Sequence, residues 1–127
     1  MKFSRQSRLL KPAEFKLVFQ QAIRSSDEYF RMLARPNELQ HHRLGLAISK
    51  KTCAKAVGRN RIKRIVRESF RDWAADPVLD STLDIVVMST VAAANHNNHA
   101  LNESLTAHWQ RLTRKAGNQQ DRLRTQR

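Results

Sequence analysis

Residues 56–71 of the chain read AVGRNRIKRIVRESFR, and the periodicity of this stretch decides which fold is expected. Four apolar side chains fall on one face at three- and four-residue steps, with Ile65 and Ser69 beside them: Ile62, Val66, Phe70 and Trp73. The pattern predicts an amphipathic helix over about residues 55–75 that ends before Pro77 and packs its apolar face on a sheet.

The opposite face of this predicted helix is cationic. Residues 50–71 hold nine basic side chains against one acid, Glu68, and a stripe at helical spacing is formed by Asn60, Arg64, Arg67 and Arg71. A solvated helix face usually alternates the sign of its charges, whereas only Glu68 and Asp72 lie near this stripe. Because guanidinium groups bind phosphate through a planar fork of donors, the row indicates a nucleic-acid ligand.

The charge of the whole chain also suggests a polyanionic partner. Lys and Arg number 24 and Asp and Glu 11, so the formal net charge is +13 over 127 residues. This balance favours nucleic acid, with an anionic membrane surface as the lesser alternative. The length suits one domain, and no apolar run or leading apolar block suggests a membrane span or secretory signal. The single Cys53 fits a reducing cytoplasm.

Two predicted elements flank the basic segment on its N-terminal side. A first helix begins near Pro12, and its apolar face comprises Phe15, Val18, Phe19 and Ala22. A strand over residues 29–35 points Phe30, Met32 and Ala34 toward the core. Its other face carries Tyr29, Arg31, Leu33 and Arg35. That face is interpreted equally well as an RNA surface or as a half-exposed strand whose Arg stems cover apolar neighbours.

The remaining elements follow from similar patterns. Strands are predicted over residues 43–49 and 83–89, and a short additional strand over residues 22–26 is an alternative. A last helix, with Asn98 as a candidate N-cap, presents Leu101, Leu105, Trp109 and Leu112. Residues 117–127 are polar and basic, which predicts a disordered tail.

Several polar groups are interpreted as structural and not as sites. His96 and His99 lie among turn residues, and the pair at residues 41–42 forms a loop without an obvious partner. Cys53 has no His nearby in the sequence, so a nucleophilic role is unsupported. Four aspartates spaced four residues apart are interpreted as surface and turn residues: Asp72, Asp76, Asp80 and Asp84.

The basic segment closely resembles the signature of the bacterial ribonuclease P protein subunit, in which Arg-Asn-Arg is followed by a hydrophobic residue and Lys-Arg, here residues 59–64. Residues 8–19, RLLKPAEFKLVF, resemble the opening helix of that family. Residues 43–51, RLGLAISKK, resemble its strand leading into the signature helix. The likeness covers about residues 5–115, with the motifs in the family's order.

The resemblance implies an α+β fold built as a two-layer α/β sandwich. The sheet would have about four strands, and with three helices the elements would follow the order αβββαβα. One βαβ crossover would be left-handed, and the fold would be of the ribosomal protein S5 domain 2-like class. Residues 1–116 would form one RNA-binding domain, with residues 117–127 as the disordered basic tail. The resemblance assigns contact with the catalytic RNA to Lys50, Lys51, Arg59, Asn60, Arg61, Lys63, Arg64, Arg67 and Arg71.

A second site is implied between the first helix and the sheet, where the family binds the single-stranded 5′ leader of precursor tRNA. The matching positions are Arg8, Phe15, Lys16, Phe19, Arg31 and Leu33. From spacing alone, Phe15 and Phe19 read as an ordinary core stripe. Leu33 stands where the family often has an aromatic, so base stacking would weaken or shift to Tyr29 or Phe30. Gly58, inside the predicted helix, would allow a close backbone approach or mark an irregular first turn.

By this resemblance the chain is an accessory subunit of an endoribonuclease that removes the leader by hydrolysing one phosphodiester. No catalytic residue, cofactor or metal is assigned to the protein, and Mg²⁺ is expected in the RNA. The implied partners are one catalytic RNA in a 1:1 complex and precursor tRNA, with no membrane and no obligate protein partner, in the cytoplasm. The alternatives are a ribosomal-type structural RNA-binding protein and a helix-turn-helix DNA-binding protein, the latter weakened by the strands before the basic helix.

Overall fold

The structure is a computed structural model that describes residues 8, 11–20, 23–37, 39, 41–75 and 82–125, with side chains described as far as residue 117. Its elements are α1 (Pro12–Gln20), β1 (Ile23–Ser26), β2 (Phe30–Pro36), β3 (Arg43–Ala47), α2 (Ala56–Ala74), β4 (Leu83–Ser89), α3 (Val91–Ala94) and α4 (Asn98–Thr125). The predicted order is confirmed, including the short strand β1. The one element that periodicity missed is α3, because four residues are too few to show a helical period.

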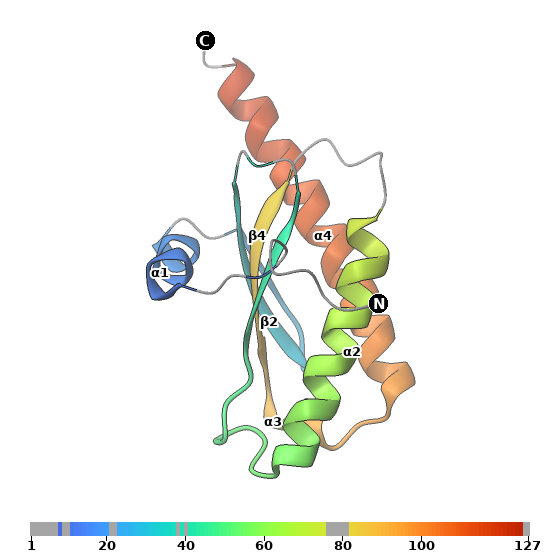
Figure 1. Ribbon diagram of the computed structural model, residues 1–127. Coiled ribbons are helices and arrows are strands. Elements are labelled where there is room, and N and C mark those ends of the chain that lie inside the picture. The colour runs from blue at the N-terminus through green and yellow to red at the C-terminus, as the bar shows by residue number, and fades with distance from the viewer. Residues whose placement is uncertain are drawn as a thin grey trace.

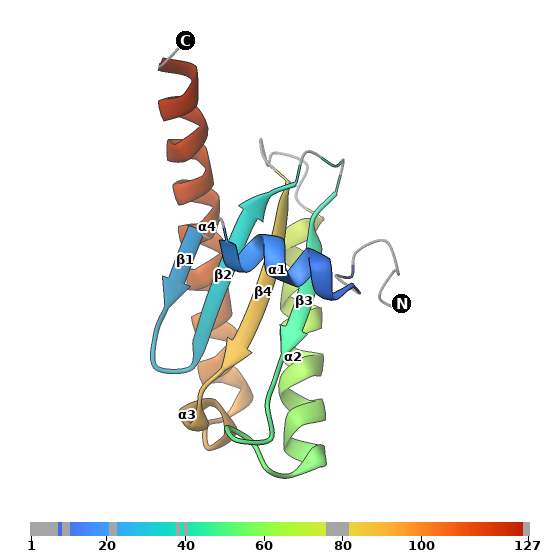
Figure 2. The same cartoon turned by 90° about the vertical axis from the view of Figure 1, so that its left-hand side faces the viewer.

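The four strands form one sheet in the order β1-β2-β4-β3. β2 is antiparallel to β1 and β4, and β3 is parallel to β4. Helices α2 and α4 cover one face of this sheet, and α1 lies across the other (Figure 1). In Figure 2, β3 and β4 both run downward, and the chain passes from β3 to β4 on its left through α2 behind the sheet. This connection is therefore left-handed, as the resemblance predicts.

The main core lies between the sheet and the helix pair α2 and α4. The apolar face predicted for α2 is buried here through Ile62, Ile65, Val66 and Phe70. From the sheet, Phe30, Met32 and Ala34 are fully buried, which confirms their predicted direction. Helix α4 contributes the four apolar residues expected of it, all buried: Leu101, Leu105, Trp109 and Leu112.

A smaller cluster on the other face fixes α1 to the sheet. Val18 and Val86 are fully buried there, and Phe15, Leu33 and Met88 pack around them. Because β4 is buried on both faces, its sequence LDIVVMS reads as a continuous apolar run and not as an alternation.

An ion-pair network also ties α1 to the sheet, and it corrects the interpretation of Asp84 as a surface residue. Asp84 is completely buried and accepts hydrogen bonds from Arg43 Nε at 2.8 Å and Arg43 Nη2 at 2.7 Å. Asn37 Nδ2 donates to the same carboxylate at 2.9 Å. Arg43 Nη1 also donates to Glu14, whose other oxygen accepts from the backbone N–H of Lys11 at 3.0 Å, as in a capping box. Arg43 therefore joins α1 to β3 and β4.

Two histidines are buried. His42 lies in the loop before β3 as predicted, but the interpretation that it has no partner is wrong. His42 Nδ1 accepts the backbone N–H of Leu83 at 3.0 Å, and its ring lies 4.3 Å from that of Trp73. His108 is fully buried under β1, where its Nδ1 lies 2.6 Å from Ser25 Oγ. Both rings therefore occupy sites that favour the neutral imidazole.

These histidines make stability depend on pH. Burial, with a smaller contribution from His41, lowers the pKa of His42 to about 4. Burial also lowers the pKa of His108, and it outweighs the opposing effect of Asp27, whose Oδ1 lies 3.1 Å from His108 Nε2. In the unfolded chain both imidazoles take up a proton near pH 6.5. The stabilisation that comes from their being neutral in the folded protein is therefore complete above that pH and is lost as the pH falls toward 4. We expect His42 alone to lower the free energy of unfolding by about 2 kcal/mol between pH 7 and pH 5 in urea titrations.

The control is His42→Asn, in which the amide oxygen can accept the same N–H without titrating. This variant should show a flatter pH dependence than the wild-type protein. A wild-type free energy of unfolding that is unchanged between pH 7 and pH 5 would contradict the prediction.

The last helix differs from expectation at both ends. Asn97, and not Asn98, caps it, because Asn97 Oδ1 accepts the backbone N–H of Ala100 at 2.9 Å. At the other end α4 continues to Thr125 and extends beyond the sheet (Figures 1 and 2), whereas a disordered tail was predicted from Gly117. The tail contains good helix formers and no proline, so an established helix can propagate through it.

Candidate nucleic-acid interface

Helix α2 presents the predicted cationic stripe on its outer face. Asn60 and Arg64 are exposed, and Arg67 and Arg71 are partly exposed. Among the described residues, no carboxylate forms an ion pair with Arg64 or Arg67. These two guanidinium groups are therefore available to an external anion.

Two arginines of the signature also bind within the protein, which sequence reasoning missed. Arg59 Nη1 donates to the carbonyl oxygens of Cys53 at 3.0 Å and Ala54 at 2.7 Å. Arg61 Nε donates to Asn98 Oδ1 at 2.9 Å, and its Nη2 donates to the carbonyl of His96. Arg59 thus braces the loop before α2, and Arg61 connects α2 to the start of α4. Both remain cations beside the stripe, and Lys63 lies partly exposed in the same helix.

The loop between β3 and α2 carries Lys50 and Lys51, both exposed. A tight turn holds them in place. The backbone N–H of Cys53 donates to the carbonyl of Ser49 at 3.1 Å, and that of Thr52 to Ser49 Oγ at 3.3 Å. The turn extends the basic surface of α2 past its N-terminus.

Gly58 allows this loop to lie against α2. A Cβ at this position would lie 2.7 Å from the sulfur of Cys53, which is buried. The group that lies close to Gly58 is therefore the Cys53 thiol of the same chain. The backbone carbonyl of Cys53 also accepts a hydrogen bond from Arg59.

Gly58→Ala is expected to displace Cys53 and the loop that holds Lys50 and Lys51. The overlap should lower the free energy of unfolding by about 1–3 kcal/mol, despite the better helix propensity of alanine. Urea denaturation would measure the loss. The double variant Gly58→Ala with Cys53→Ala removes the overlapping sulfur and should recover much of it. A Gly58→Ala protein as stable as the wild type would contradict this account.

The residues predicted for the leader site come from α1, from β2 and, for Arg8, from a bridge to β3. Helix α1 crosses one face of the sheet (Figure 2). Lys16 is exposed, and 47% of Phe19 is exposed, whereas Phe15 packs on the small apolar cluster with Leu33. Arg31 is exposed on the same face of β2 as Leu33. Arg8 is exposed and forms an isolated parallel bridge with Leu44 of β3. The core interpretation therefore fits Phe15 in part and does not fit Phe19.

The aromatic residues suggested as replacements at the Leu33 position are placed elsewhere. Phe30 is fully buried on the α2 and α4 side of the sheet, so a shift of base stacking to Phe30 is excluded. Tyr29 packs against the main core, and its ring lies edge-on to that of His96 at 4.8 Å. Phe19 is thus the more exposed of the aromatic rings near this face.

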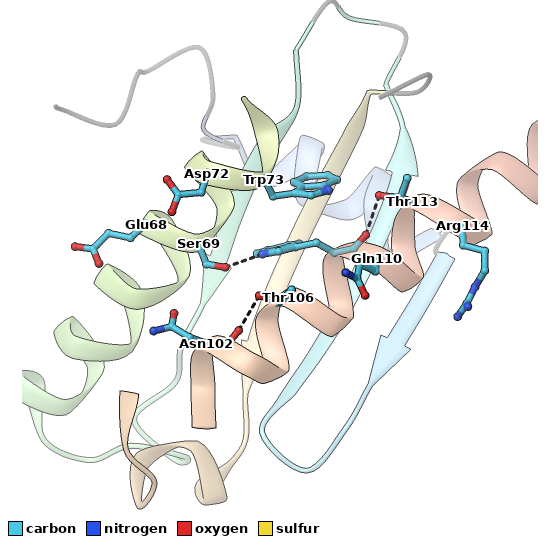
Figure 3. Close-up of a pocket in the computed structure, with 10 residues that line it drawn as sticks. Glu68, Ser69, Asp72, Trp73, Asn102, Thr106, Gln110, Thr113 and Arg114 are labelled. Carbon is cyan, nitrogen blue, oxygen red and sulfur yellow. Dashed lines mark hydrogen bonds between the residues drawn. The ribbon is translucent and has the colours of Figure 1, made fainter. Parts of the chain in front are cut away.

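A pocket of about 870 Å³ lies between α2 and α4, on the side of the sheet away from α1 (Figure 3). The rings of Trp73 and Trp109 stack there at 5.3 Å, and Trp109 Nε1 donates to Ser69 Oγ at 2.8 Å. Glu68, Asp72 and Arg114 line the same pocket. Because its two carboxylates outnumber its one cation, this pocket does not extend the basic surface of α2.

The described residues lack three further features. They contain no group of three or more His, Cys, Asp or Glu side chains arranged to hold a metal ion. No helix within the described part of the chain combines the length and apolar character needed to cross a membrane. Helix α2 directly follows a loop and β3, so the described residues 41–75 have no helix-turn-helix arrangement.

Sequence comparison relates this chain to ribonuclease P proteins. The family model Ribonuclease P matches residues 3–113. The ribonuclease P protein component of Methylococcus capsulatus is 51% identical over 113 residues, which cover 89% of this chain and 86% of the relative. That of Aliivibrio fischeri is 46% identical over 112 residues, covering 88% and 93%.

Solved structures agree with these sequence matches. The RNase P protein of Staphylococcus aureus superposes with a TM-score of 0.72 at 29% identity, covering 80% of this chain and 90% of that chain. The RNase P protein from Thermotoga maritima gives a TM-score of 0.70 at 31% identity, covering 82% and 96%. With the family model and the relatives each covering most of its length, the chain belongs to the ribonuclease P protein family.

Proposed function

We propose that this chain is the protein component of ribonuclease P, which binds a catalytic RNA and promotes removal of the 5′ leader from precursor tRNA. The observation that carries the proposal is the presence of two separate surfaces on one rigid sheet. The stripe on α2 offers Arg64 and Arg67 to folded RNA. The face crossed by α1 offers Lys16, Phe19 and Arg31 to a single strand.

The two surfaces suit different RNA ligands. The stripe and the lysine turn beside it offer cations without an exposed aromatic ring, as fits a phosphate backbone whose shape is set by RNA folding. The α1 face combines cations with the exposed ring of Phe19, and rings on which bases stack are typical of single-strand sites. A ribosomal-type structural protein would need only the first surface.

In this proposal the phosphodiester hydrolysis is performed by the RNA, with Mg²⁺ held there. The protein contributes net positive charge, which reduces repulsion among phosphates and so favours metal occupancy of the RNA at low Mg²⁺. One protein would bind one catalytic RNA in the cytoplasm, without an obligate protein partner.

The direct test measures cleavage of precursor tRNA by the catalytic RNA at low Mg²⁺, with and without this protein. The proposal expects stimulation by the wild-type protein and little by Arg64→Ala with Arg67→Ala. Mature tRNA with a 5′-phosphate should be the product. No stimulation by the wild-type protein at any Mg²⁺ concentration would refute the proposal.

Phe19→Ala tests the single-strand surface separately. If a leader base stacks on this half-exposed ring, affinity for precursor tRNA with a leader should fall by about 1–3 kcal/mol. Affinity for leaderless tRNA should hold, because the ring is not part of the core. Leu17→Ala is the matched control, since Leu17 is also an exposed apolar residue of α1. Equal losses for both RNAs would mean that Phe19 does not contact the leader.

A further inference from the structure

A second group of cations lies at the β1 edge of the sheet, at the opposite edge from β3. Arg24 is exposed on β1, the outermost strand, and Arg114 and Lys115 are exposed on α4. Arg111, one turn earlier on α4, is partly exposed. We call these four residues the edge cluster. None of them belongs to the two surfaces assigned above, and Arg114 also lines the pocket between α2 and α4.

Contacts between α4 and β1 hold Arg24, Arg111 and Lys115 together at this edge. Lys115 Nζ donates to the carbonyl of Arg24, and Arg111 Nη1 donates to Ser25 Oγ at 3.3 Å. Ser25 Oγ also lies 2.6 Å from Nδ1 of the buried His108. Because these contacts join α4 to the edge strand, the cations of both elements are presented from a fixed platform.

No carboxylate among the described residues neutralises the edge cluster through an ion pair. Asp27, which directly follows β1, is already engaged, and its Oδ1 lies 3.1 Å from His108 Nε2. Its Oδ1 accepts the backbone N–H groups of Tyr29 and Phe30, each at 2.9 Å, and its Oδ2 accepts Ser104 Oγ. Cations held close together without acidic partners form a site for an anion that carries several charges.

The edge cluster is continuous with the sheet face assigned to single-stranded RNA. In the β1–β2 register, Arg24 is paired with Leu33, and Ser26 is paired with Arg31. Neighbouring strands lie about 4.8 Å apart, so an RNA strand that crosses from β2 to β1 on this face reaches Arg24 of the edge cluster within that distance. A single strand that leaves Arg31 and Leu33 toward β1 therefore meets Arg24 first and then α4.

From this placement we propose that the edge cluster binds the sugar–phosphate backbone of leader nucleotides upstream of those held on the α1 face. The inference rests on the proposed function. The cluster offers cations and no aromatic ring, so it contacts phosphates and is indifferent to base sequence. A long leader is thereby held more tightly than a short one, whatever its sequence.

The test uses the complex of protein and catalytic RNA with precursor tRNAs whose leaders are lengthened one nucleotide at a time. The variant is Arg114→Gln with Lys115→Gln, which removes two exposed cations while keeping good helix formers. Arg64→Gln with Arg67→Gln is the control with equal charge loss. Thermal melting verifies that each variant is folded, and Arg24→Gln tests the β1 side independently.

We expect the wild-type complex to gain affinity as the leader grows beyond the α1 face, and the edge variants to lose that gain. For long leaders, two lost phosphate contacts should reduce the slope of log K against log salt by about 1.4. The control should weaken binding at every leader length alike. A melting temperature and a leader-length profile that match the wild type in both edge variants would overturn the inference.

A different result would also overturn it. If the edge variants bind catalytic RNA alone more weakly and keep the leader-length profile, the cluster contacts the ribozyme and not the leader. Failure of the proposed function is seen separately, as absence of stimulation by the wild-type protein with every leader.

Discussion

Arg64→Ala with Arg67→Ala is expected to weaken binding of the catalytic RNA and to reduce the salt dependence of that binding. Hydrogen bonds to charged groups contribute about 1.5–3 kcal/mol each, so the two losses together should cost at least about a hundredfold in affinity. Each lost phosphate contact should also lower the slope of log K against log salt by about one unit. Both effects follow from guanidinium groups that face solvent and form no ion pair with described carboxylates.

Titrations of labelled catalytic RNA at several salt concentrations would measure both quantities. The matched control is Arg64→Lys with Arg67→Lys, which keeps the charge and removes the planar fork. That control should retain the wild-type slope and lose only part of the affinity. A slope that stays at the wild-type value in the alanine variant would show that neither residue meets a phosphate.

Arg43→Met should cause the largest loss of stability among single substitutions at the ion-pair network. The substitution removes the two shortest hydrogen bonds of the buried Asp84 carboxylate and leaves Arg35, whose Nε lies 3.7 Å from Asp84 Oδ2, as its described cationic neighbour. Removing one partner of a buried pair typically costs about 3–5 kcal/mol. Helix α1 also loses the contact between Arg43 and Glu14. Relative to the wild-type protein, hydrogen exchange should therefore accelerate more at the amides of α1 than at those of α2.

Urea denaturation would measure the free energy, and hydrogen exchange would measure the release of α1. Lys16→Met is the control, because it removes the same charge from an exposed position on α1 and should change stability by less than about 0.5 kcal/mol. Adding Asp84→Leu to Arg43→Met removes the stranded carboxylate and should restore part of the loss. Equal stabilities of Arg43→Met and Lys16→Met would contradict the proposed role of the network.

The sequence by itself determined α2 and its two faces. A 3.6-residue period is a local property, so the spacing of Ile62, Val66 and Phe70 predicts a buried stripe and hence an exposed one opposite it. The bounds of β4 were equally clear, because a short run of apolar, β-branched residues favours a buried strand over a helix or a loop. The signature then led to the family, and with it to the left-handed crossover, which periodicity could not predict.

Only the tertiary structure decided which polar residues are buried and which cations are held by the protein itself. Asp84 is buried because Arg43, 41 residues away in the chain, completes its hydrogen bonds, and His108 meets Ser25 across 83 residues. Arg61 is drawn to Asn98 across 37 residues in the same way. Local patterns report the preference of each residue for helix, strand or solvent. A buried polar group is instead stabilised by a partner that long-range packing brings to it, and such partners are not encoded at any fixed spacing.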